Sequence, residues 1–244
     1  MQPLQLEQLY YFHDTLTLFM VCIWLTIVCL GLILKNNKYK TYISYGLIGF
    51  AVIQEILDYI NRIFLDELYY FKLSTDLPLQ FCIIGFYFSL FGIYMSISKK
   101  TFNPKLEQFI FDCAYVLGFS GAFQGLISVD LTGVNNMIGA FTLNWAHSLI
   151  ILNVLWLIFA YGKRFHLIGI LHTFLFINII IIPVGLINYI LDANYMFICQ
   201  PPNVDSSFII GEWPYYLLYI EGIYLIYIYI LYLPFLISRK LKFK

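Results

Sequence analysis

The chain has 244 residues, of which 61% are hydrophobic, 20% are aromatic and only 11% are charged, with a formal net charge of zero. A soluble domain carries about 25% charged residues, so this chain has too little charge to solvate a globular surface or to neutralise a nucleic-acid backbone. The composition therefore predicts an integral membrane protein and excludes a nucleic-acid partner.

Seven apolar stretches have about the 20 residues that a helix needs to cross a bilayer. They lie at residues 15–34, 41–60, 77–98, 109–127, 138–161, 167–190 and 213–237. The sequence thus predicts an all-α fold, a single seven-helix transmembrane bundle over residues 15–237. An outer segment at 1–14 precedes the bundle, and a basic cytoplasmic tail at 238–244 follows it.

The basic residues indicate how the bundle is oriented. Of the fourteen Lys and Arg residues, all except Arg62 and Lys72 fall in alternate connections between the predicted spans. Because Lys and Arg are retained on the cytoplasmic side, we expect the N-terminus outside and the C-terminus inside. The protein is accordingly predicted to be a multi-pass component of the cell membrane.

Polar residues inside the predicted spans cluster at one depth. A helix rises about 1.5 Å per residue, which places Cys82 about 8 Å and His147 about 13 Å from the outer ends of their spans. Most of the other polar groups also lie in the outer half, and polar groups within a bilayer are costly enough to suggest function. The supporting candidates are Glu55, Asp58, Gln124, Asn144, Asn188 and Glu221.

Cys82 and His147 are the candidate catalytic residues, because a thiol becomes a nucleophile when a base lies beside it. Each also has an ordinary structural interpretation, as a small packing residue or as a buried hydrogen-bonding group. His147 lies far in depth from His166 and His172, so no metal site is expected, and no cofactor is predicted. The five cysteines are scattered over the spans and are expected to be free thiols.

Several sequence runs stand out between about residues 70 and 235. They are Leu77-Pro78-Leu79-Gln80-Phe81-Cys82, Asn144-Trp145-Ala146-His147, Asn188-Tyr189, Asn194-Tyr195-Met196-Phe197, Pro201-Pro202 and Trp213-Pro214-Tyr215. With these runs the region resembles bacterial YwaF-type integral membrane proteins, which are related to the eukaryotic transmembrane protein 164 group. The resemblance implies a seven-span protein of the bacterial plasma membrane that acts on phospholipids or other acyl lipids, with Cys82 as nucleophile and His147 as base.

The implied reaction is transfer or hydrolysis of a fatty acyl chain. His147 would deprotonate Cys82, and the thioester formed from a lipid ester would be resolved by a lysolipid hydroxyl or by water. The sequence leaves the supporting roles open. Glu55, Asp58 or Glu221 could orient the imidazole, and Asn144, Gln124 or Asn188 could stabilise the oxyanion.

Two other functions fit the same residues. Carboxylates and a histidine at one depth could serve a proton- or solute-handling carrier, in which case Glu55 or Glu221 would matter and Cys82 would not. The chain could also be a non-enzymatic partner of a larger membrane assembly. The absence of an internal repeat in the sequence weighs against the carrier.

Overall fold

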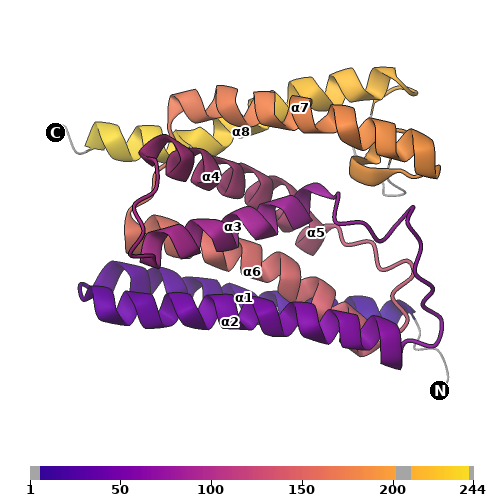
Figure 1. Ribbon diagram of the computed structural model, residues 1–244, viewed down its shortest axis with the longest axis horizontal. Coiled ribbons are helices and arrows are strands. Elements are labelled where there is room, and N and C mark those ends of the chain that lie inside the picture. The colour runs from indigo at the N-terminus through magenta and orange to yellow at the C-terminus, as the bar shows by residue number, and fades with distance from the viewer. Residues whose placement is uncertain (1–5, 202–209, 242–244) are drawn as a thin grey trace. The chain divides into compact units, whose positions relative to one another are not determined.

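The structure, a computed structural model, describes residues 6–201 and 210–241. Helix makes up 78% of the described residues, which contain no strand, so the predicted all-α class is confirmed (Figure 1). Several sequence predictions lie outside the described residues. These are the first five residues of the outer segment, Pro202 of the Pro201-Pro202 pair, and the last three residues of the basic tail.

Among the described residues, six helical stretches are long and apolar enough to cross a membrane. The protein is therefore a multi-pass membrane protein, while the predicted outside location of its N-terminus stays a prediction. The stretches are α1 (Leu6–Ile33), α2 (Asn37–Ile60) with the π-helix η1 (Asn61–Leu65), α4 (Pro104–Leu117) with the π-helix η2 (Gly118–Ala122) and α5 (Phe123–Ile127), α6 (Met137–Tyr161), α7 (Leu167–Leu191) and α8 (Tyr215–Leu241).

The remaining predicted span corresponds to α3 (Phe81–Ile97), which has 17 residues and is therefore about 26 Å long. The sequence placed the start of this span at residue 77, whereas the helix begins at Phe81. Pro78 and its neighbours instead form an irregular segment before the helix. As a result Cys82 is the second residue of α3 and lies in its first turn, rather than deeper inside the helix.

Asparagine side chains set the start of three of these helices. The Oδ1 atoms of Asn36, Asn103 and Asn136 accept hydrogen bonds from backbone N–H groups in the first turns of α2, α4 and α6, at 2.8, 2.9 and 2.8 Å. Such a cap satisfies an N–H group that has no partner within the helix. At the opposite end of α6, Gly162 adopts a φ of 68°, which only glycine reaches without strain.

The contacts divide the chain into two units. Unit 1 comprises Met1–Tyr70 and Gly85–Lys163, and unit 2 comprises Phe71–Ile84 and Arg164–Lys244. In unit 1, α6 is the central helix, against which α1, α2 and α4 pack. Trp156 of α6 is fully buried and donates from its indole nitrogen to Ser44 Oγ of α2 at 2.9 Å.

Glycines let the helices of unit 1 approach one another closely. A Cβ atom added at Gly31 of α1 would lie 2.9 Å from the backbone carbonyl carbon of Phe159 in α6. A Cβ atom at Gly118 of η2 would lie 2.9 Å from the Ile150 side chain, also in α6. Helices inside membranes associate through such contacts, because lipid supplies no hydrophobic driving force between them.

Unit 2 contains a small apolar cluster near the turn after α7. Val184, Ala193, Tyr195 and Met196 are buried in it, and side chains from the segment that leads into α3, Leu77 and Phe81 among them, pack against it. The segment before α3 is thereby joined to the turn that follows α7.

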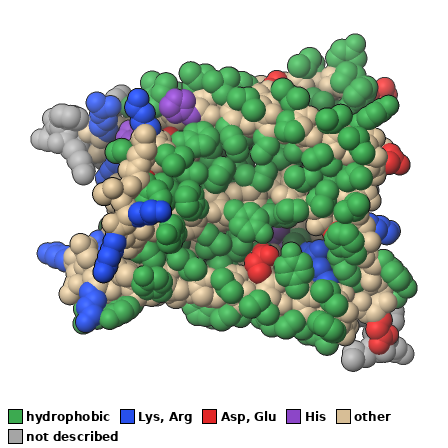
Figure 2. Space-filling view, viewed as in Figure 1, with side chains coloured by type: hydrophobic (Ala, Val, Ile, Leu, Met, Phe, Trp, Pro, Cys, Tyr) green, Lys and Arg blue, Asp and Glu red, His purple; other side chains and the backbone are tan. Residues whose placement is uncertain are grey.

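Large hydrophobic side chains remain exposed in both units, as a lipid environment requires. On α1, Leu18, Leu25 and Leu32 are 72%, 62% and 65% exposed and recur every seven residues along one face. On α7, Ile179, Ile182 and Leu186 form a similar stripe. Figure 2 shows how densely such side chains cover the visible face of the molecule.

The close approach of α1 to α6 predicts that Gly31→Ala lowers stability. The added methyl group must displace backbone of α6, and overpacking of this kind costs about 1–3 kcal/mol. We expect a lower midpoint in thermal unfolding of the detergent-solubilised protein.

Gly46→Ala in α2 is the matched control, since a Cβ atom there meets nothing within 4 Å. Alanine is about 1 kcal/mol better than glycine in a helix, so the control should be neutral or slightly stabilising. Equal midpoints for the two variants would contradict the close contact.

Candidate functional site

In unit 2, the segment before Cys82 is held by the turn after α7. The hydroxyl group of Tyr195 donates to the Leu73 carbonyl at 2.7 Å and accepts from the Leu77 N–H at 2.9 Å. Gln80 Oε1 accepts from the Met196 N–H at 3.0 Å. The backbone leading into α3 is therefore fixed at three points within nine residues of Cys82.

Tyr195 can play this part because it remains protonated. Its side chain is 1% exposed, and burial raises the pKa of the phenol above its usual value. The phenol therefore stays neutral at physiological pH and keeps donating to Leu73.

The turn that carries Tyr195 is itself held by Asn188 of α7. The Asn188 side chain donates to the Tyr195 carbonyl at 2.9 Å and accepts from the Tyr195 N–H at 2.8 Å. Both ends of this amide are thus engaged in shaping the turn. A role for Asn188 in stabilising an oxyanion stays a prediction, and it would have to compete with these two bonds.

Residues at the start of α8 complete the support of this turn. Tyr216 donates from its hydroxyl to the Phe197 carbonyl at 2.6 Å, and Trp213 donates from its indole to the Ile198 carbonyl at 3.1 Å. Met196 and Phe197 have φ values of 57° and 52°, which cost about 1–2 kcal/mol per residue for L-amino acids. These side-chain bonds help to hold the backbone in that conformation.

Cys82 is a partly buried free thiol, and the other four cysteines are free as well, as the sequence predicted. Its place in the first turn of α3 brings it near backbone N–H groups that have no partner within the helix, which favours a thiolate. Partial burial opposes the charge, so a nucleophilic Cys82 needs a base.

In unit 1, the backbone determines which nitrogen of His147 can act as a base. The Nδ1 atom lies 2.9 Å from the carbonyl oxygen of Leu143, one turn earlier in α6. A carbonyl only accepts, so Nδ1 carries the proton and the neutral ring keeps its lone pair on Nε2. The sequence analysis expected a carboxylate to orient the imidazole by binding one of its nitrogens. In the structure the Leu143 carbonyl contacts Nδ1 instead.

The Nε2 side of the ring faces α5, where a glycine makes room for it. A Cβ atom at Gly125 would lie 2.9 Å from Nε2. The π-helix η2 immediately precedes α5 and therefore helps to determine the position of Gly125. Turns of π-helix are frequent at functional sites. Gln124, the residue before Gly125, has an exposed side chain.

The predicted amide Asn144 ties α6 to α1. Its Nδ2 atom donates to Thr17 Oγ1 at 2.7 Å and to the His13 carbonyl at 3.2 Å, and its Oδ1 atom accepts from Ser148 at 3.2 Å. Like Asn188, Asn144 has both ends of its amide engaged within the protein.

One of the two predicted carboxylates of α2, Asp58, meets α6 at another point. Asp58 accepts from Thr142 Oγ1 at 2.9 Å and forms an ion pair with Arg62 at 2.7 Å. Glu55 lies near enough to both Asp58 and Arg62 to interact with their charges. Glu221 is partly buried in α8 of unit 2. Cys82 belongs to unit 2 and His147 to unit 1, and their pairing stays a prediction.

The sequence analysis did not consider His13, which it placed in the outer segment. Helix α1 begins at Leu6, so His13 lies inside it and is fully buried. Neither ring nitrogen has a hydrogen-bond partner among the described residues, and Nδ1 is 3.5 Å from the Asp14 carboxylate. One pattern in the sequence could have indicated this burial. A helix would place four residues on one face, and these are Leu9, His13, Met20 and Trp24.

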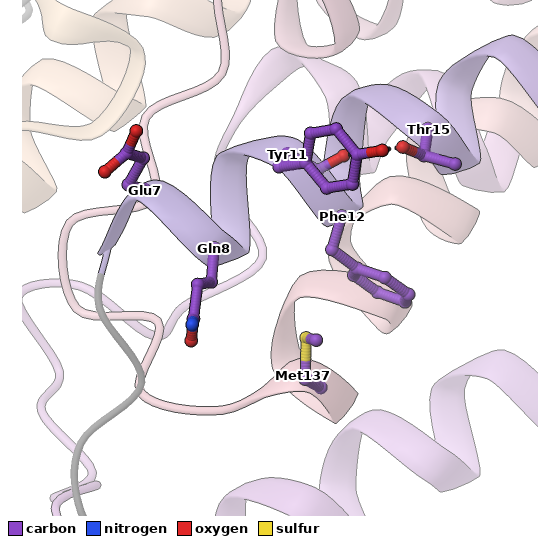
Figure 3. Close-up of a pocket in the computed structure, with 6 residues that line it drawn as sticks. All are labelled: Glu7, Gln8, Tyr11, Phe12, Thr15 and Met137. Carbon is purple, nitrogen blue, oxygen red and sulfur yellow. Dashed lines mark hydrogen bonds between the residues drawn. The ribbon is translucent and has the colours of Figure 1, made fainter.

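A hollow of about 600 Å³ opens on another face of α1 (Figure 3). Its lining consists of Glu7, Gln8, Tyr11, Phe12, Thr15 and Met137. None of the predicted catalytic or supporting residues lies in it, so this hollow is not the site that the sequence predicted.

Comparison with known proteins gives one match. The model of the TMEM164 family matches residues 4–232. No curated protein and no solved structure matches the chain. The matched range includes both Cys82 and His147. It also covers the N-terminal third of the chain, which contains none of the sequence runs on which the resemblance was based.

The double hydrogen bond of Tyr195 predicts the effect of Tyr195→Phe. Removing the hydroxyl leaves the Leu73 carbonyl and the Leu77 N–H without their partner, which costs about 1–3 kcal/mol. We expect faster hydrogen exchange at the amide of Leu77 and in the segment before α3.

Tyr189→Phe is the matched control, because Tyr189 is 87% exposed and loses the same atom. Unchanged exchange before α3 in Tyr195→Phe, relative to this control, would show that the anchor contributes nothing.

Proposed function

Because the chain belongs to the TMEM164 family, we propose that this multi-pass membrane protein is an enzyme that transfers or hydrolyses the acyl chains of membrane lipids. The family match confirms the resemblance seen in the sequence. The reaction implied by that resemblance, transfer or hydrolysis of a fatty acyl chain, supplies the reaction class. The proposed location is a bacterial plasma membrane, with the site in its outer half.

The proposed reaction has two steps. In the first, His147 Nε2 takes the proton of the Cys82 thiol, the sulfur bonds to the ester carbonyl carbon, and the C–O bond breaks as the departing lysolipid oxygen takes that proton. In the second, Nε2 takes a proton from an acceptor hydroxyl or water, whose oxygen bonds to the thioester carbon. The C–S bond then breaks, and the thiolate recovers the proton.

The observation that carries the proposal is the bond between His147 Nδ1 and the Leu143 carbonyl. It leaves the lone pair on Nε2, the form that a general base requires. The anchored start of α3 adds support, because a nucleophile needs a fixed position for an effective attack. Cys82 in the first turn of its helix also suits the depth of lipid ester groups, just below the headgroups.

Gln124 is the amide that we propose for the oxyanion. Asn144 and Asn188 each use both ends of the side chain within the protein. The Gln124 side chain is exposed instead, and it lies next to Gly125, which packs against His147. Donors for an oxyanion act best when they have no competing partner.

Cys82→Ala should abolish formation of an acyl-enzyme. The purified protein, incubated with phospholipid carrying a labelled acyl chain, should acquire a label that hydroxylamine releases, as expected for a thioester. The variant should lose both this label and turnover.

Cys29→Ala provides the comparison, because Cys29 is exposed in α1 and its loss should leave labelling unchanged. Normal acyl turnover by Cys82→Ala would refute the proposed nucleophile.

His147→Asn should slow acylation of Cys82 by at least about 100-fold, the lower range for loss of a general base. Asparagine places a nitrogen near the Nδ1 position, where it can still donate to Leu143, but it has no counterpart of Nε2. The folded protein should therefore persist while acylation, followed by the same label, declines.

His172→Asn is the control, since His172 is an exposed residue of α7 and its replacement should leave the rate unchanged. A normal acylation rate in His147→Asn would remove His147 from the mechanism.

A further inference from the structure

Exposed lysines gather at one end of unit 1. They lie in the α1–α2 and α3–α4 connections and in the first turns of the helices that follow, and they are Lys35, Lys38, Lys99, Lys100 and Lys105. Among the residues that the structure describes, no carboxylate pairs with any of the five. Figure 2 shows Lys and Arg side chains at the end where Figure 1 draws the start of α2 and the connection from α3 to α4. We call these five lysines the basic surface.

The C-terminal end of α6 brings the two connections together. On one side, the Lys40 ammonium group of α2 donates to the Ala160 carbonyl near the end of α6. On the other side, Lys163, two residues beyond α6, forms an ion pair with Glu107 of α4 at 2.8 Å. Both connections therefore border the same helix end, although about 60 residues separate them in the sequence.

The chain itself offers the basic surface little opposite charge. Glu107 is the only acidic residue in the two connections and the first turns that follow them, and Lys163 already pairs with it. Gathered like charges repel one another and destabilise the folded state unless counter-charge comes to them. An anionic partner from outside the chain therefore fits this surface.

Aromatic side chains place the basic surface at the level of lipid headgroups. On the first turns of α2, Tyr39, Tyr42 and Tyr45 are 56%, 58% and 59% exposed. At the end of α3, Tyr94 is 46% exposed and packs edge-on against Phe102 of the α3–α4 connection. Tyrosine is enriched where membrane meets water, with its ring at headgroup depth. Lipid phosphates therefore lie within reach of the lysine side chains.

We propose that the basic surface binds the headgroups of anionic phospholipids in the adjoining leaflet. Each ammonium group offers three donors to phosphate oxygens, and each lysine near an anionic membrane strengthens binding about fivefold. Lysine is retained on the cytoplasmic side of membranes, and the cytoplasmic leaflet carries anionic lipid. The exposed tyrosines favour a lipid over a soluble anion, because only a lipid offers their rings an apolar neighbour. This binding requires no reaction at Cys82.

Replacing three of the lysines with glutamine tests the surface. The purified protein in a neutral detergent is given equal amounts of dioleoyl phosphatidylglycerol and dioleoyl phosphatidylcholine, and the retained lipid is counted by native mass spectrometry. The wild type should prefer phosphatidylglycerol at least about tenfold. Lys99→Gln combined with Lys100→Gln and Lys105→Gln should lower this preference at least about tenfold. Equal retention of both lipids by the wild type, or an unchanged preference in the triple variant, would overturn the inference.

Two controls separate charge at this surface from other effects of substitution. Arginine at the same three positions keeps the charge and should keep the preference. Lys72→Gln removes an exposed lysine of unit 2 and should also leave the preference unchanged. Because all of these side chains are exposed, the variants should unfold at the wild-type midpoint when no lipid is added. Loss of the preference in the arginine variant would contradict binding through charge.

Thermal unfolding identifies the source of the phosphate. Phosphatidylglycerol should raise the midpoint of the wild type, because a ligand that binds only the folded state stabilises it. The rise should shrink as ionic strength increases and should be smaller in the glutamine variant. Glycerol 3-phosphate, which has a phosphate but no acyl chains, should not reproduce it. An equal rise with glycerol 3-phosphate would overturn the assignment to a lipid, and a rise that salt leaves unchanged would overturn its electrostatic origin.

Discussion

The structure depends on one constraint, which is that polar side chains within a bilayer must find their partners inside the protein. In unit 1 these partners converge on α6. Asn144 bonds to α1, Thr142 bonds to Asp58 of α2, and Trp156 bonds to Ser44 farther along. The apolar faces of these helices could contact lipid as readily as one another, so hydrogen bonds and glycine contacts determine which helices meet.

The same constraint explains why the possible base is well defined. A histidine on a membrane helix needs a partner for its donor, and in His147 the Leu143 carbonyl supplies it. Satisfying Nδ1 leaves an acceptor on the other side of the ring, against Gly125. The bond that pairs this buried polar group thus also leaves free the lone pair that the proposed base requires.

In unit 2 the sequence runs that carried the family resemblance form a support for α3. Asn188 shapes the turn after α7, Tyr195 binds the backbone on the way to Cys82, and Trp213 secures the far side of the turn. These residues hold the backbone conformation of the turn and of the segment before α3. Through these bonds, residues that are distant in the sequence help to determine the position of the Cys82 thiol.

The sequence by itself determined that the protein is helical and membrane-embedded, because the length of an apolar stretch is a local property. The same holds for the capping of α6 by Asn136, which needs only the next few residues. The start of α3 depended on the tertiary structure, since distant residues such as Tyr195 bind the segment that local hydropathy assigns to the helix. Tertiary structure also decided that Asn144 bonds within the protein and that His13 lies fully buried, with its Nδ1 atom 3.5 Å from the Asp14 carboxylate. The hydrogen bonds of a polar side chain depend on groups from other helices, which its own sequence neighbourhood does not reveal.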